Sequence, residues 1–287
     1  MNKQKIVAGT AQLGFQYFHK EKITKKRSEK ILETLVKNNV KMLDTASSYG
    51  KSEEFIGDFL KKNNHKFIIC TKLRKSYSKN RLKFKDNIKE SIFNSLRRLE
   101  VKKIDYFFIH NYEDMNTFAS NELLKFKSNK VLKNIGASIY TINDYKKCFN
   151  LNFNILQIPF NFIDHRFLKI IRKDRKHKFF VRSILLRGNI QKNNISFPSK
   201  KKFKGLKKNL DIFKKKYGFK NYFDLNFSFI KSFKKINFVI IGFKNVNQIK
   251  ILSDFKKIKP MNKIEINELQ QIVKKSKIEN DIDLRFW

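Results

Sequence analysis

Two kinds of hydrophobic pattern alternate along the chain. Short runs rich in Ile, Val and Phe are apolar at nearly every position, which predicts strands buried on both faces. Longer segments have apolar residues three and four positions apart, which predicts amphipathic helices. The predicted strands are 5–9, 41–44, 67–72, 104–110, 132–138, 155–159, 179–183 and 238–242. The predicted helices are 26–38, 52–62, 84–99, 118–127, 142–149, 166–176, 246–255 and 266–277.

Eight strand–helix units in 287 residues match the size of a (β/α)8 TIM barrel, an α/β fold. One stretch breaks the rhythm, because a long insertion at about 186–237 separates strands seven and eight. Within it we predict helices at 206–216 and 222–233, and a solvated loop for the basic run 200–202. Since no linker or internal repeat is visible, we expect 1–287 to form a single barrel domain.

The composition is strongly basic, with 65 Lys and Arg against 25 Asp and Glu and a formal net charge of +40. Such a charge is typical of a nucleic-acid-binding protein. However, Lys outnumbers Arg by 54 to 11, whereas nucleic-acid sites favour Arg for bidentate contacts. The chain also has 30 Phe but only 9 Gly and 3 Pro, a skew that an A/T-rich genome imposes on almost any protein. We therefore attribute the charge to codon bias and expect no nucleic-acid partner.

Several other classes of protein and site find no support in the sequence. No run of about 18 apolar residues is present, so neither a transmembrane helix nor a membrane partner is expected. Residues 1–11 lack the apolar stretch of a signal peptide, and two cysteines, Cys70 and Cys148, indicate a reducing compartment. We expect a cytoplasmic protein in which Cys70 is a buried small hydrophobe. No His and Cys cluster has zinc spacing, so no metal site is expected.

Polar residues stand at the end of nearly every predicted strand. The active site of a (β/α)8 barrel forms at the C-terminal ends of its strands. In chain order these residues are Asp44, Lys72, His110, Ser138, Gln157, Arg182 with Ser183, and Gly242. Core packing alone would not produce this arrangement, so we expect a functional site there.

Four residues combine into a chemical unit: Asp44, Tyr49, Lys72 and His110. A free phenol has a pKa near ~10, too high for efficient proton donation at neutral pH. A neighbouring ammonium favours the phenolate and is expected to lower the pKa of Tyr49, while a carboxylate holds that ammonium charged and in place. An imidazole can orient a substrate carbonyl. The set fits carbonyl reduction, in which Tyr49 protonates the oxygen while a cofactor delivers hydride to the carbon.

Several segments resemble the aldo-keto reductases in order and spacing. The most specific is Asp-Thr-Ala-Ser-Ser-Tyr-Gly at 44–50, with Ser and Glu shortly after it. The other matching segments are 9–14, 71–72, 109–110, 135–138, 157–161 and 240–242. The resemblance covers nearly the whole chain and implies a (β/α)8 barrel that binds NADH or NADPH without a Rossmann domain. It also implies Tyr49 as the acid and base, Lys72 and Asp44 as its partners, and His110 as the residue that orients the carbonyl.

The resemblance further implies a cofactor site made by Thr10, Ser138, Gln157, Arg182, Ser183, Gly242, Lys244 and Gln248. Three positions depart from the family's pattern. Ser138-Ile139 stands where Ser-Asn commonly contacts the nicotinamide carboxamide, and Arg182 stands where many members stack a Tyr under the nicotinamide. Lys244 matches a phosphate contact of NADP-preferring members, but the downstream Arg of those members is missing. The sequence therefore leaves two alternatives for the cofactor, NADH and NADPH. Arg182 is assigned equally to a cofactor contact, a substrate contact or a salt bridge.

The leading hypothesis is an NAD(P)H-dependent reductase of a small aldehyde or ketone. Ser138-Ile139 with Arg182-Ser183 resembles a bacterial branch near sugar-related biosynthesis genes, which makes a sugar-related substrate one alternative. A second hypothesis is a cofactor-binding regulatory or sensor barrel with little turnover. Substrate specificity is expected in the loops after strands one, four and seven and in the C-terminal tail with Phe286 and Trp287. The sequence does not indicate an oligomeric state.

Overall fold

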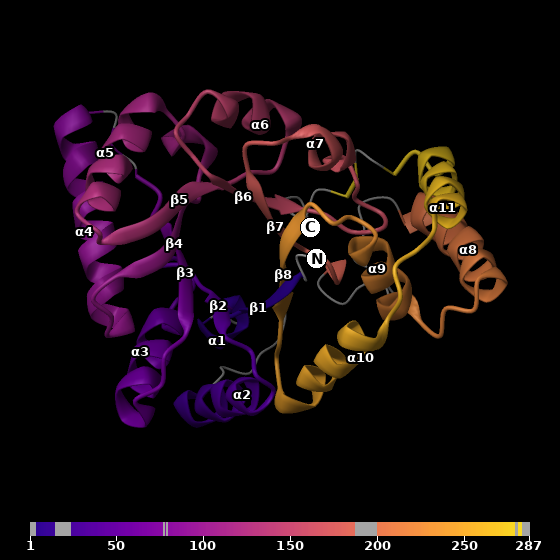
Figure 1. Ribbon diagram of the computed structural model, residues 1–287, viewed down its shortest axis with the longest axis horizontal. Helices are drawn as coiled ribbons and strands as arrows, with labels where there is room; N and C mark the ends of the chain where they lie inside the picture. The colour runs from indigo at the N-terminus through magenta and orange to yellow at the C-terminus, as the bar shows by residue number, and fades with distance from the viewer. Residues whose placement is uncertain are drawn as a thin grey trace.

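The computed structural model describes residues 4–14, 24–76, 78, 80–186, 200–278 and 281–282. Eight parallel strands close into a barrel in chain order, which confirms the predicted (β/α)8 fold (Figure 1). The strands are β1 (Lys5–Gly9), β2 (Met42–Asp44), β3 (Ile68–Leu73), β4 (Ile104–Ile109), β5 (Leu132–Ser138), β6 (Ile155–Pro159), β7 (Lys178–Arg182) and β8 (Ile236–Gly242). Three predicted strands have these bounds, and the other five differ by at most two residues at either end.

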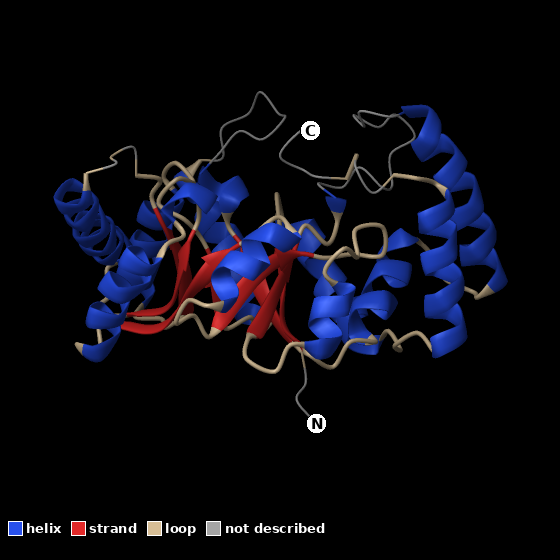
Figure 2. Cartoon of the chain, turned by 90° about the horizontal axis from the view of Figure 1, so that it is seen from above, coloured by secondary structure: helices blue, strands red, loops and turns tan. Residues whose placement is uncertain are grey.

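The helices surround the strands on the outside of the barrel (Figure 2). Those that follow the first seven strands are α1 (Ala11–Gly14), α2 (Lys25–Lys37), α3 (Ser52–Asn63), α4 (Arg81–Leu99), η1 (Tyr112–Asp114), α5 (Thr117–Ser128), α6 (Ile142–Phe149) and α7 (Leu168–Lys173). The insertion and the end of the chain form α8 (Lys200–Lys216), α9 (Tyr222–Lys231), η3 (Val246–Lys250), α10 (Ile251–Lys257) and α11 (Lys263–Lys275). Within the described part of the chain, no helix combines the length and apolarity needed to cross a bilayer.

Three predictions about helices need correction. The basic run 200–202 is the first turn of α8 and not a loop, because Phe203, Leu206 and Leu210 bury one face of a longer amphipathic helix. This helix packs against α11, with Lys216 Nζ 2.7 Å from a carboxylate oxygen of Glu268 (Figure 2). The predicted helix 166–176 is only α7, since the Asp174 carboxylate accepts hydrogen bonds from the next backbone amides and turns the chain. The predicted helix 246–255 begins as the 3-10 turn η3.

The interior of the barrel is filled by apolar side chains that point inward from the strands. Phe180 and Phe238 stack with ring centres 4.0 Å apart, and Tyr106 packs edge-on against Phe180 at 5.1 Å. The other members of this inner cluster are Val7, Met42, Ile68, Cys70, Phe108, Ile155 and Ile240. A larger apolar cluster lies between the strands and the helices. The strands are therefore buried on both faces, and Cys70 is buried, as predicted.

Helix α3 passes very close to the end of α4, because Gly57 of α3 has no side chain at the point of contact. A Cβ atom added to Gly57 would lie 2.0 Å from the backbone oxygen of Arg98. The close approach also brings Glu53 of α3 to the Arg98 side chain, with Arg98 Nη2 2.6 Å from Glu53 Oε2. The spacing of these two helices therefore depends on the missing side chain at position 57.

Gly57→Ala is expected to lower the free energy of unfolding by about 1–3 kcal/mol, because the added methyl group overpacks the contact between α3 and α4. Urea unfolding followed by circular dichroism measures the change. Gly205→Ala is the matched control, since a Cβ at this exposed position in α8 meets nothing within 4 Å. The control should be neutral or stabilising by up to about 1 kcal/mol. Equal behaviour of the two variants would contradict the close approach.

Candidate active site

The candidate site lies at the C-terminal ends of the strands, directly above the inner cluster. Side chains alternate along a strand, so a residue two positions beyond an inward-pointing residue also points inward. The inner-cluster residues Met42, Cys70, Phe108, Ile155, Phe180 and Ile240 are followed two positions later by Asp44, Lys72, His110, Gln157, Arg182 and Gly242. The polar residues predicted from strand ends thus share the barrel mouth.

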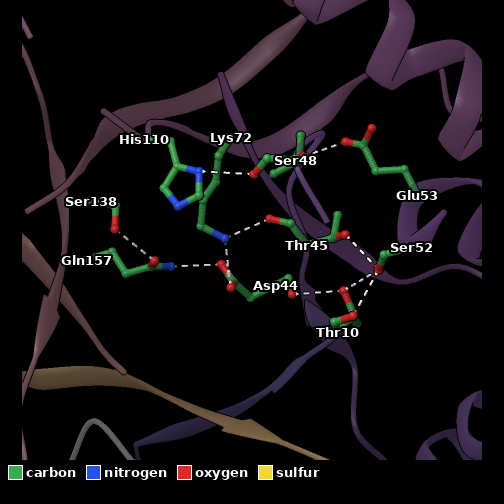
Figure 3. Close-up of polar contacts among 11 residues, drawn as sticks. Thr10, Asp44, Thr45, Ser48, Ser52, Glu53, Lys72, His110, Ser138 and Gln157 are labelled. Atoms are coloured by element: carbon green, nitrogen blue, oxygen red, sulfur yellow. Dashed lines mark hydrogen bonds and ion pairs between the residues drawn. The ribbon is translucent and has the colours of Figure 1, made fainter. Parts of the chain in front are cut away.

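A buried ion pair between Asp44 and Lys72 forms the centre of this site (Figure 3). Lys72 Nζ lies 2.8 Å from Asp44 Oδ2 and donates a second hydrogen bond, of 2.7 Å, to the backbone oxygen of Thr45. The Lys72 side chain has no exposed surface, and that of Asp44 is 6% exposed. The carboxylate and the ammonium that the sequence suggested as partners are thus directly paired.

Tyr49 and His110 stand above the ion pair, toward solvent. Lys72 Nζ lies 4.9 Å from the centre of the Tyr49 ring and is a hydrogen-bond partner of its hydroxyl group. The Tyr49 and His110 rings meet edge-on with their centres 6.0 Å apart. Ser48 Oγ lies 3.4 Å from His110 Nδ1 (Figure 3). The acid, ammonium, phenol and imidazole predicted as one unit therefore follow one another in a continuous series, from Asp44 to Lys72, Tyr49 and His110.

The electrostatics of the site differ from the expectation in one respect. Burial raises the pKa of Tyr49 above its ordinary value, and this effect outweighs the opposing charge of Lys72. The expected net lowering of the Tyr49 pKa is therefore wrong for this state of the protein, although Lys72 acts in the expected direction. For Lys72, burial acts to lower the pKa, but Asp44 and Tyr49 together raise it, so the ammonium stays charged.

His110 has a pKa lowered to about 3, first by burial and then by the charges of Lys72 and Arg182. The imidazole is therefore neutral near pH 7 and carries one N–H donor. A neutral imidazole can donate a hydrogen bond to a carbonyl oxygen, as the sequence analysis expected of His110.

Ser138 and Gln157 extend the network from the ion pair across the barrel. Gln157 Nε2 donates to Asp44 Oδ1 over 2.8 Å, and Ser138 Oγ donates to Gln157 Oε1 over 3.1 Å (Figure 3). Both side chains are about 1% exposed. Both residues were predicted to contact the cofactor, and the structure shows that they also fix the second oxygen of Asp44.

Arg182 and Ser183 belong to a second cluster at the same mouth. The Arg182 guanidinium lies 4.0 Å from the centre of the Tyr140 ring, and its Nη2 donates to the backbone oxygen of Ile139 over 3.0 Å. Ser183 has a φ of 59°, in the left-handed region, and its hydroxyl group lies 3.4 Å from Arg182 Nη1. Arg182 therefore reaches from β7 across the end of β6 to the end of β5.

The residues predicted after β8 form a third group. Gln248 Oε1 accepts a 2.7 Å hydrogen bond from the backbone N–H of Lys244, and Asn245 caps η3 through the backbone N–H of Gln248. Gly242 is exposed, and a Cβ added there would lie 3.9 Å from the backbone oxygen of Gly9, an ordinary van der Waals contact. None of the contacts described joins this group to the Asp44–Lys72 pair. Phe286, Trp287 and most of the loops after β1 and β7 lie outside the described residues.

Comparison with known proteins decides the family, since the model of the aldo/keto reductase family matches residues 5–274. This chain belongs to the aldo/keto reductase family. A glycerol dehydrogenase from Gluconobacter oxydans is 17% identical with a TM-score of 0.74, over 97% of this chain and 94% of that one. The holo form of an aldo-keto reductase from Bacillus halodurans is 19% identical with a TM-score of 0.73, over 93% and 91%. No curated protein sequence matches the chain significantly.

Membership of the aldo/keto reductase family identifies the chain as an oxidoreductase of the nicotinamide-dependent kind. The similarity to the solved structures, below one fifth identity, establishes only the fold that this reductase shares with them. Among the described residues, no group of three His, Cys, Asp or Glu side chains is placed to hold a metal ion.

The sequence analysis missed the buried groups that support this reductase's site from behind. Glu53 is 1% exposed, accepts a 2.6 Å hydrogen bond from Thr71 Oγ1 and pairs with Arg98. Ser52 Oγ donates to Thr10 Oγ1 over 2.8 Å. Thr10 and Ser52 thus form a hydroxyl network under Asp44, and Glu53 holds the residue next to Lys72. The Ser-Glu pair after the Asp-Thr-Ala motif was the available signal, but it was used only as part of the family resemblance.

The lowered pKa of His110 predicts that its imidazole stays neutral between pH 5 and 8. Nitrogen-15 NMR of the imidazole measures the protonation, and the His110→Gln variant assigns the signal. In the unfolded chain the imidazole takes up its proton near the ordinary pKa of ~6.5. The stability that neutral His110 contributes is therefore present above that pH and lost as the pH falls toward 3. A protonation midpoint near 6.5 in the folded protein would contradict this environment.

Proposed function

We propose that this protein reduces the carbonyl group of a small aldehyde or ketone with NADH or NADPH, and that Tyr49 donates the proton. The observation that carries the proposal is the buried Asp44–Lys72 pair in contact with the Tyr49 phenol, beside a neutral His110. A phenol next to a fixed ammonium can release a proton and remain stabilised as phenolate.

The residues around the mouth fit a nicotinamide dinucleotide. Ser138 and Gln157 offer a hydroxyl group and an amide for the carboxamide. On the other side, Lys244 and the capped start of η3 offer a cation and a helical N-terminus for a phosphate, a site that barrels use after strands seven and eight. When bound, the cofactor supplies hydride to the carbonyl carbon. NADH and NADPH are both compatible with Lys244, and Ser183 completes the proposed cofactor side.

Four residues of the chain have separate roles in the proposed proton transfer. Ser48 Oγ lies 3.4 Å from His110 Nδ1. In the tautomer with the proton on Nε2, Nδ1 accepts from this hydroxyl group and Nε2 donates a hydrogen bond to the carbonyl oxygen. Tyr49 transfers its hydroxyl proton to that oxygen as negative charge develops there. Lys72 stabilises the resulting phenolate, and Asp44 keeps Lys72 charged and in place. Solvent then restores the proton on Tyr49.

We further propose one barrel domain spanning 1–287 that works in the cytoplasm on a small molecule. The +40 charge is assigned to codon bias and not to nucleic acid, and a sugar-related carbonyl compound stays one substrate alternative. The other candidate is a cofactor-binding regulatory or sensor barrel with little turnover. Steady-state assays with a panel of carbonyl compounds distinguish the two.

Tyr49→Phe should lower kcat for reduction by at least about 10²- to 10⁴-fold, the contribution of a positioned proton donor. The ring is retained, so the binding of NADH and NADPH, measured by nicotinamide fluorescence quenching, should stay within about threefold of the unmodified protein. Full turnover in this variant would remove Tyr49 from the proton-donating role.

Lys72→Met should reduce kcat and move the alkaline decline of the reaction to higher pH. Burial already raises the pKa of Tyr49, and removing the ammonium that opposes this effect raises it further. A more basic phenol is a poorer acid at neutral pH. The measurement is the dependence of kcat on pH, and Lys75→Met, on the exposed rim after β3, is the control. An unchanged profile would contradict the role of Lys72.

A further inference from the structure

At the barrel mouth, Arg182 carries a positive charge that none of the described carboxylates neutralises. Lys72 pairs with Asp44, and Arg166 forms a double hydrogen bond with Asp164, with contacts of 2.8 and 2.9 Å. In the part of the chain that the structure describes, Arg182 has only neutral partners, namely a backbone oxygen, a hydroxyl group and an aromatic ring. Among the described residues, none accepts a hydrogen bond from its buried Nε.

A rigid platform holds this charge in place. The backbone N–H of Tyr140 donates to Asp144 Oδ2 over 2.8 Å, and its carbonyl oxygen accepts a hydrogen bond from Arg166. Asp144 is itself fixed in the capping box that starts α6. The ring of Tyr140 thereby supports the Arg182 guanidinium at 4.0 Å, an arrangement that is worth more as water is excluded. Arg182 is thus pre-organised before any ligand arrives.

The platform faces the catalytic group. Arg182 follows the inward-pointing Phe180 by two positions, so its side chain projects over the barrel interior and not toward the helices. The charge of Arg182 contributes to the lowered pKa of His110, and Tyr140 contributes to the raised pKa of Tyr49. A group bound by Arg182 would therefore share the barrel mouth with the carbonyl that Tyr49 and His110 would hold.

We propose that Arg182 binds a carboxylate of the substrate, so that this reductase acts on carbonyl compounds that carry a carboxylate near the reacting carbon. The inference rests on the reduction proposed above and names its substrate class. A carboxylate matches the uncompensated charge of Arg182, and its planar geometry suits a guanidinium. Binding it also gives the guanidinium an anionic hydrogen-bond partner, which the described neutral contacts do not supply.

The test compares kcat/KM for succinic semialdehyde with that for butyraldehyde, which has a methyl group in place of the carboxylate. The unmodified protein should prefer the carboxylate. Arg182→Gln should lower the ratio of the two values by about 10- to 100-fold, the usual contribution of a hydrogen bond to a charged group. Arg182→Lys keeps the charge but loses the planar pair of donors, so its ratio should lie between those of the unmodified protein and Arg182→Gln. Arg175→Gln, at an exposed position before β7, is the control and should leave the ratio unchanged.

Two results would overturn the inference while leaving the proposed reduction intact. One is reduction of both aldehydes with no preference for the carboxylate in the unmodified protein. The other is an equal loss for both aldehydes in Arg182→Gln together with weaker quenching by NADH and NADPH, which would assign Arg182 to the cofactor. A preference for glyceraldehyde 3-phosphate over glyceraldehyde without a preference for succinic semialdehyde would contradict a carboxylate.

If neither aldehyde is reduced, the proposed function fails, and binding alone decides the role of Arg182. Isothermal titration calorimetry with succinate then compares the unmodified protein with the Arg182→Gln and Arg175→Gln variants. Succinate binding that only Arg182→Gln weakens by at least tenfold supports a carboxylate site. Absent or unaltered succinate binding contradicts it. Thermal unfolding of each variant shows that the fold is retained.

Discussion

The structure of the site depends on one constraint, the burial of the Lys72 ammonium. A charge without solvent contact is costly unless a partner and further hydrogen bonds compensate it. Asp44 and the backbone oxygen of Thr45 supply them, and Gln157 in turn holds the other oxygen of Asp44. Asp44 and Lys72 come from the neighbouring strands β2 and β3, whereas Gln157 comes from β6. The complete set of contacts around the ion pair therefore forms only when the barrel has closed with the correct register.

Most of the fold and the central residues of the site were predictable because both follow from local pattern. Fully apolar runs marked the strands, and in a barrel the residue that ends such a run stands at the functional face. Asp44, Lys72 and His110 are polar residues of this kind, and the structure places them within one network together with Tyr49. The Asp-Thr-Ala motif added the family, which the match over residues 5–274 confirms.

The features that could not be predicted from the sequence are contacts between segments that lie far apart in the chain. The pKa of Tyr49 is set by a balance between burial and the charge of Lys72, and burial is not visible in a motif. The sequence gives no sign that Glu53 of α3 is a buried partner of Arg98 in another helix, α4. The platform of Tyr140 under Arg182 joins the ends of β5 and β7, two strands that do not pair with each other. The first turn of α8 was missed because its residues are mostly lysines. Phe203, the first residue of the buried face, stands among them.

The stacked Phe180 and Phe238 rings, with Tyr106 against them, form a solid floor below the ion pair. A close-packed layer of this kind offers no route along the barrel axis to molecules the size of a metabolite. Whatever reaches Asp44 and Lys72 from the mouth must leave by the same way. When two ligands share this entrance, the one that binds deeper must bind first and dissociate last. The packed interior therefore determines the order of binding without contacting either ligand.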